Sequence, residues 1–127
     1  MRNAAVQSRE GSFQNLVVTG ELLLGSHGSV TQITSISTGV TLSTKRGTIT
    51  TFDPALAAAA EAEFVVTNTE VHPNSVVCVA VKSGPGDNEH VIAFVSAVAE
   101  GSFSVVLSNL AAANQADGAM EINFVVI

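Results

Sequence analysis

The chain has 127 residues, which suits a single domain, and a net charge of −6. Hydrophobic residues make up 46% of it, enough for a sizeable core, but charged residues only 13%, against about 25% in an ordinary globular protein. With five Lys and Arg residues in all, the sequence lacks the basic patch of a nucleic-acid binder. No segment approaches the roughly 18 apolar residues of a membrane span, and the first twelve residues lack the apolar core of a secretory signal. We therefore expect neither nucleic acid nor a membrane as partner.

Two apolar triplets lie near the N-terminus, at 16–18 and 22–24, with a Thr-Gly-Glu turn between them. Residues 1–12 are mostly small and polar and slightly basic, whereas the rest of the chain is acidic. The triplets could form a hairpin added to the domain, or residues 1–25 could form an arm that packs on a neighbouring subunit or a shell. A lone hairpin is barely stable, so we expect the arm.

In the arm interpretation, the apolar side chains become buried against another chain. This would cover apolar surface that a free hairpin would expose to water. The predicted partner-binding residues are Phe13, Leu16, Val17, Leu22 and Leu24.

Residues 26–127 read almost entirely as β-strands, and we expect them to form one β-sandwich domain. Runs rich in Val, Ile, Thr and Phe are separated by turns of Gly, Pro, Asn and Asp at short, regular spacing. We predict an all-β fold: an antiparallel, jelly-roll-like β-sandwich of about eight strands. In chain order, the predicted strands are 29–36, 39–42, 47–52, 61–69, 75–82, 90–99, 102–110 and 119–127.

Some segments carry a more specific expectation. The stretch 43–46 before Gly47 resembles a hairpin turn between two strands. The strand 75–82 is apolar on both faces, which predicts a central strand with Cys78 buried. The stretch 53–62 begins with Asp-Pro and continues with alanines, which fits either one or two helical turns or an irregular loop.

The phenylalanines and the strand at 102–110 identify further core positions. Alternation there places Phe103, Val105 and Leu107 on one inward face. The phenylalanines within strands are predicted to be core residues: Phe64, Phe94, Phe103 and Phe124.

Residues that carry chemistry are sparse. His27, His72 and His90 have no partner at metal-ligand spacing, and Cys78, the only cysteine, cannot build a zinc cluster or an internal disulfide. No serine has a nucleophile-elbow glycine pattern. The acidic stretch 87–89 is explained as part of a Gly/Pro turn, because it lacks the spacing of a calcium loop. We therefore predict no catalytic residue, metal or cofactor, and a protein that is not an enzyme.

Several segments together resemble a small β-domain of tailed-bacteriophage virion proteins. They are "GSVTQITSISTGVTLSTKRGTITT", "AEAEFVVTNTEV", "SVVCVAVKSG", "VSAVAEGSFSVVLSNL" and "EINFVVI", and they cover roughly residues 28–127. The chain departs from that pattern at Ser43, where Asn is frequent, and in "AAAAEA", where a Gly occurs. Both departures lie in predicted turns and concern loop shape rather than the fold.

The resemblance implies a structural protein on the surface of a virion. Such domains occur as head decoration proteins, head fibres and parts of tail fibres, and trimers are common among them. Fibre modules usually belong to much longer chains, so one domain with a short arm favours a capsid decoration (cement) protein bound to the major capsid protein or another virion protein. The alternative is a head- or tail-fibre adhesion module that binds a host receptor. The absence of Trp and Tyr weakens a glycan-binding role, because aromatic rings commonly serve as binding platforms.

Overall fold

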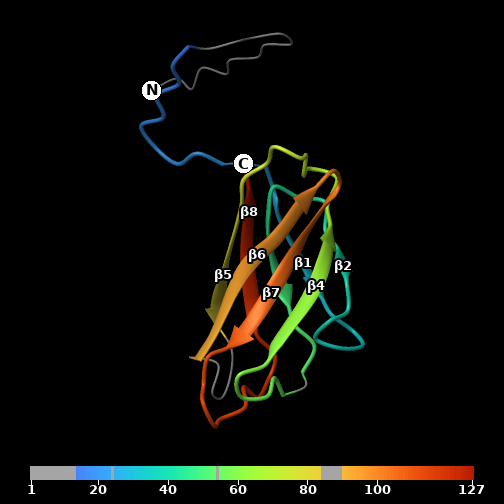
Figure 1. Ribbon diagram of the computed structural model, residues 1–127. Coiled ribbons are helices and arrows are strands. Elements are labelled where there is room, and N and C mark those ends of the chain that lie inside the picture. The colour runs from blue at the N-terminus through green and yellow to red at the C-terminus, as the bar shows by residue number, and fades with distance from the viewer. Residues whose placement is uncertain (1–13, 24, 54, 84–89) are drawn as a thin grey trace.

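The computed structural model describes residues 14–23, 25–53, 55–83 and 90–127. Within them, eight strands form two four-stranded sheets packed as a sandwich (Figure 1). The all-β sandwich of eight strands predicted from the sequence is thereby confirmed. The strands are β1 (His27–Thr31), β2 (Val40–Thr41), β3 (Arg46–Thr50), β4 (Glu61–Thr67), β5 (Val77–Ser83), β6 (Val91–Ala99), β7 (Ser102–Asn109) and β8 (Glu121–Val126).

The chain passes repeatedly from one sheet to the other. Sheet 1 has the order β1-β3-β8-β5 and sheet 2 the order β2-β4-β7-β6, so the first six strands alternate between the sheets. The direction of the chain reverses at each crossing. Two crossings therefore bring it back parallel to the earlier strand, which explains the parallel pairs β1/β3 and β2/β4. The sheets are mixed, and the prediction of a purely antiparallel sandwich was wrong in this respect.

The predicted hairpin around 43–46 was also wrong. β2 and β3 belong to different sheets, so this segment is a crossing. The turn chemistry was correctly recognised, since Thr44 Oγ1 donates a hydrogen bond to the carbonyl of Arg46 at 2.8 Å. Local turn signals cannot tell a turn within one sheet from a turn between two.

The core lies between the sheets and contains three of the four predicted phenylalanines. Phe64, Phe103 and Phe124 are buried, and the rings of Phe103 and Phe124 pack with centroids 5.4 Å apart. Val105 and Leu107 are buried beside Phe103, as the alternation predicts.

Two predicted core residues lie on the surface instead. Phe94 is 40% exposed, because the inward positions of β6 before its irregularity are Val91, Ala93 and Val95. Cys78 is exposed on β5, which pairs only with β8 and is the edge strand of sheet 1, not a central strand. Both residues point away from the core, onto faces that no other described element covers.

The alanine-rich stretch 55–60 is an irregular loop. Leu56 forms an isolated antiparallel bridge with Ala116, which anchors the loop to the segment before β8. Ala59 has a φ of 56°, the left-handed conformation that normally favours glycine.

Three buried carboxamide side chains hold the loops at the ends of the sandwich. Gln32 donates to the carbonyls of Ile36 and Thr38 and accepts from the amide of Phe52. Asn68 donates to the carbonyl of Thr44 and accepts from the amide of Glu70. Asn109, the third side chain, accepts from the amide of Ala111. Its amide group also donates to three loop carbonyls, those of Leu56, Ala57 and Asn114. Each of the three side chains is at most 2% exposed. Without them, the loop amides and carbonyls that they bond would be buried without partners.

We expect Asn109→Ala to lower the free energy of unfolding by about 2–4 kcal/mol, because it leaves several buried groups without a partner at about 1–3 kcal/mol each. Urea denaturation measures the change. Asn114→Ala is the control, since that side chain is exposed and its substitution should matter by less than about 0.5 kcal/mol. Equal effects of the two substitutions would show that the buried carboxamide does not hold the loops.

We expect Ala59→Gly to leave thermal stability unchanged or raise it by up to about 1 kcal/mol. The left-handed conformation costs an alanine about 1–2 kcal/mol, and the substitution relieves this strain. Glycine also gives the unfolded chain more conformational entropy, which lowers stability by up to about 1 kcal/mol. The control, Ala57→Gly, has no such strain to relieve and should lower stability. A loss at residue 59 as large as at residue 57 would contradict the argument.

Candidate interaction surfaces

In the described part of the chain, no cluster of metal-ligating side chains forms. No three His, Cys, Asp or Glu side chains come together among these residues. His27 Nε2 lies 2.9 Å from Thr48 Oγ1, and His72 Nδ1 lies 3.2 Å from Glu100 Oε1 in an exposed ion pair. The stretch 87–89 lies outside the described residues. Among the described residues there is no helix of the length and hydrophobicity needed to cross a bilayer.

The N-terminal segment is the first candidate surface. Residues 14–23 contain no strand, and every one of them is exposed. Leu16 is 67% exposed, Val17 82% and Leu22 57%. Figure 1 shows the segment extending beyond the end of the sandwich where β8 finishes. Phe13 and Leu24, the other predicted partner-binding residues, lie outside the described residues.

A hollow marks the place where this segment joins the sandwich. Its lining combines Leu23 and Gly25 with Lys45 of the β2–β3 crossing and the C-terminal residues Val126 and Ile127. Gly25 has a φ of 71°, which lets the chain turn sharply before β1. Ile127 is 70% exposed, so the apolar surface of the arm continues onto the end of the sandwich.

The outer face of sheet 1 carries a row of hydrogen-bonded polar side chains. The Thr48 hydroxyl donates to Asn123 Oδ1 at 2.8 Å and lies next to His27 Nε2. Arg46 lies beside His27 in the strand register. Its Nε is buried without a hydrogen-bond acceptor, the one such atom among the described side chains.

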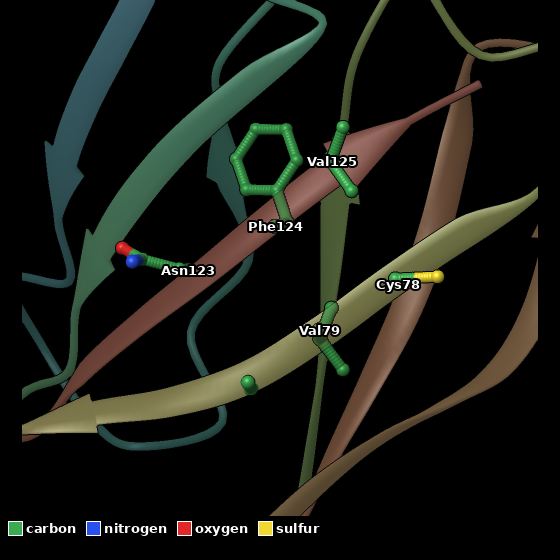
Figure 2. A pocket seen from close by; sticks show the side chains of 6 residues that line it. Cys78, Val79, Asn123, Phe124 and Val125 are labelled. Atoms are coloured by element: carbon green, nitrogen blue, oxygen red, sulfur yellow. The ribbon is translucent and has the colours of Figure 1, made fainter.

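On the same outer face, β5 and β8 form a shallow apolar hollow of about 230 Å³. Its lining includes Cys78, Ala80, Asn123 and Val125 (Figure 2). Val125 is the register partner of both Arg46 on β3 and Cys78 on β5. A charged group and an apolar hollow therefore lie in one row across the sheet, two strands apart.

The outer face of sheet 2 is acidic and apolar. Glu61 and Glu63 are exposed on β4. Val65, Ile92 and Phe94 are 46%, 46% and 40% exposed, which is unusual for such large apolar residues. Between β4 and β6, β7 contributes mainly serines to this face.

The sequence of β4 contains a pattern that indicates the outer face of sheet 2. In "EAEFVVT", acidic and apolar residues alternate with period two, and the structure places Ala62, Phe64 and Val66 in the core. No such pattern indicates that Phe94 faces outward, because both faces of β6 carry apolar residues.

No protein-family model, curated protein or solved structure matches this chain.

We expect Lys82→Met to raise the pKa of Glu121. Lys82 Nζ lies 3.0 Å from this carboxylate and Ser83 donates a hydrogen bond at 2.8 Å. The pKa of Glu121 is lowered below its ordinary value of 4.5. The hydrogen bond from Lys82 is the largest cause, followed by the hydrogen bond from Ser83 and the positive charge of Lys82. A lowered folded-state pKa stabilises the fold above pH 4.5, and this contribution is lost as the pH falls through the lowered value.

An NMR titration of the carboxyl groups measures this pKa directly. Lys45→Met, which removes the ion pair with Glu70, is the matched control and should leave Glu121 unchanged. An unaltered Glu121 pKa in Lys82→Met would show that the ion pair does not form in solution.

Proposed function

We propose that this protein is a structural component of a tailed-bacteriophage particle, most specifically a capsid decoration (cement) protein that binds the head shell through its N-terminal arm. The observation that carries the proposal is the exposed segment 14–23 with its large apolar side chains. A segment of this composition gains free energy when a partner removes it from water. The resemblance to virion β-domains supports the particle as the place where that partner is found.

Burial of the apolar side chains of the arm would offset part of the cost of ordering it on a partner. Full burial of one Leu or Val contributes roughly 1.5–3 kcal/mol, so Leu16, Val17, Leu22 and Leu23 together contribute about 6–12 kcal/mol. Ordering the backbone costs about 1–2 kcal/mol per residue. Backbone hydrogen bonds must supply the remainder, most simply by adding a strand to an exposed sheet edge of the partner.

The proposal includes a homotrimer and a jelly-roll-like arrangement on the virion surface. The low charge content and the exposed apolar side chains on sheet 2 support association, since closed symmetry buries one patch repeatedly. The alternation of the first six strands between the sheets supports the jelly-roll description.

The alternative is a head- or tail-fibre adhesion module that binds a receptor on the host surface. The observation in its favour is the hollow of sheet 1, which combines apolar side chains with the amide of Asn123, to which the nearby Thr48 hydroxyl donates a hydrogen bond. A receptor-binding module would use this surface and leave the arm for attachment to the fibre.

The test compares the full chain with a truncation that starts at Gly25. We expect the truncated protein to fold and remain soluble but to lose binding to purified heads, because the apolar arm provides the contact. Circular dichroism checks the fold, and antibody-labelled electron microscopy shows whether the full chain lies on heads or on tails. Unfolding of the truncated protein would assign the segment to the domain core, and undiminished head binding would exclude the arm as anchor.

A matched pair of substitutions refines this test. Leu16→Ser removes an apolar side chain from the arm, whereas Leu110→Ser removes one that is similarly exposed (63%) in a loop of the domain. We expect Leu16→Ser to weaken head binding by about tenfold, which matches the loss of one buried Leu. Leu110→Ser should have little effect. Equal effects would point to general surface hydrophobicity rather than the arm.

A further inference from the structure

The outer faces of the two sheets are complementary to each other. We propose that copies of this protein associate head to tail, with the outer face of sheet 2 of one copy on the outer face of sheet 1 of the next. In this contact Glu63 pairs with Arg46, and Phe94 enters the hollow beside Cys78. This contact is distinct from the closed homotrimer of the proposed function; it concerns self-association alone and does not require head binding.

Arg46 supplies the positive side of the contact. Among the described residues, Lys45 and Lys82 each have a carboxylate partner, Glu70 and Glu121, whereas Arg46 has none. Its buried Nε also lacks an acceptor. A buried guanidinium donor without an acceptor is costly, and a carboxylate is the acceptor that suits it best. Arg46 is therefore the described cationic side chain best suited to pair with an anionic group from a second subunit.

Glu63 supplies the negative side. It is exposed near the middle of β4, and its Oε1 accepts a hydrogen bond from Ser96 at 2.6 Å, which orients the carboxylate over sheet 2. Among the described residues no Lys, Arg or His forms an ion pair with it. Glu61, two residues earlier on the same face, adds to the negative potential and would draw the cationic face of a second copy.

The spacing of the charged and apolar groups agrees between the two faces. On sheet 2, Glu63 is the register partner of Val106, which is in turn the partner of Phe94. On sheet 1, the corresponding row is Arg46, Val125 and Cys78. Each row spans two strand spacings, about 9.6 Å in total. Placing Glu63 on Arg46 therefore brings Phe94 over Cys78.

The hollow beside Cys78 suits an aromatic ring. Its lining is almost entirely apolar, from Cys78, Ala80 and Val125, and Asn123 is its polar member (Figure 2). Phe94 projects from the opposite sheet with 40% of its surface exposed. One contact would thus cover an exposed phenylalanine, fill the hollow and pair two charges.

This contact joins two different surfaces, so it is heterologous. In a pair, each copy still has one of its two outer faces uncovered, so further copies add until a ring closes or a filament grows. A self-limiting dimer is therefore not expected. A four-stranded face is smaller than the roughly 800 Å² per partner of a standard interface, so we expect weak association in solution.

The test is a charge exchange in the full chain, followed by sedimentation equilibrium over a wide concentration range. Arg46→Glu and Glu63→Arg should each weaken association by at least about tenfold, because each places like charges together. The double variant restores the opposite pair and should return association to within about threefold of the wild type. Glu100→Arg, on the β6–β7 turn away from both faces, is the control and should leave association unchanged.

A second measurement uses the exposed thiol of Cys78, and its first readout needs only the wild-type protein. Alkylation of wild-type Cys78 should slow by at least about threefold at concentrations where oligomers form, and Phe94→Ala should abolish this protection. A wild type that is monomeric at every concentration, a self-limiting dimer, a double variant no better than the single variants, or undiminished alkylation would each overturn the proposal. Since none of these readouts involves phage heads, a failure to bind heads leaves the result intact.

Discussion

The arrangement of this sandwich depends on the satisfaction of loop backbone groups by buried carboxamides. Because the chain crosses between the sheets after each of its first five strands, most connections run over the ends of the sandwich and have no strand ladder to pair with. Gln32, Asn68 and Asn109 lie at or just beyond strand ends, where a short side chain with both donor and acceptor can reach several loop groups at once. Without these bonds the crossings would bury unpaired amides and carbonyls.

The same topology leaves both outer faces of the sandwich uncovered. All described secondary structure lies in the two sheets, so each sheet has one face in the core and one available for contact. The outer face of sheet 1 is polar and carries Arg46, whereas that of sheet 2 carries Glu61, Glu63 and the exposed ring of Phe94. With an apolar segment leaving one end, these features favour a protein that works through contacts with other chains.

Errors in the sequence interpretation occurred where position within a sheet decides the outcome. Cys78 lies in a run that is apolar at every position, and such a run fits a central strand as well as an edge strand. The structure places it at an edge because β5 finds only β8 as partner. Phe94 was misassigned for a similar reason, since either face of β6 could have faced inward. By contrast, "SFSVVLSN" alternates serine with large apolar residues, and there the inward face was correctly predicted.

The local pattern of the sequence by itself determined the class of the fold, the positions of most strands and the absence of a long helix among the described residues. It also located two apolar triplets near the N-terminus, whose described residues are exposed. Those properties depend on side-chain alternation and turn residues within about ten positions of each other. Strand order, the two parallel pairs and the row that joins Arg46 to the hollow beside Cys78 were decided only by the tertiary structure. They bring together residues from β3, β5 and β8, and no local periodicity encodes which strands become neighbours.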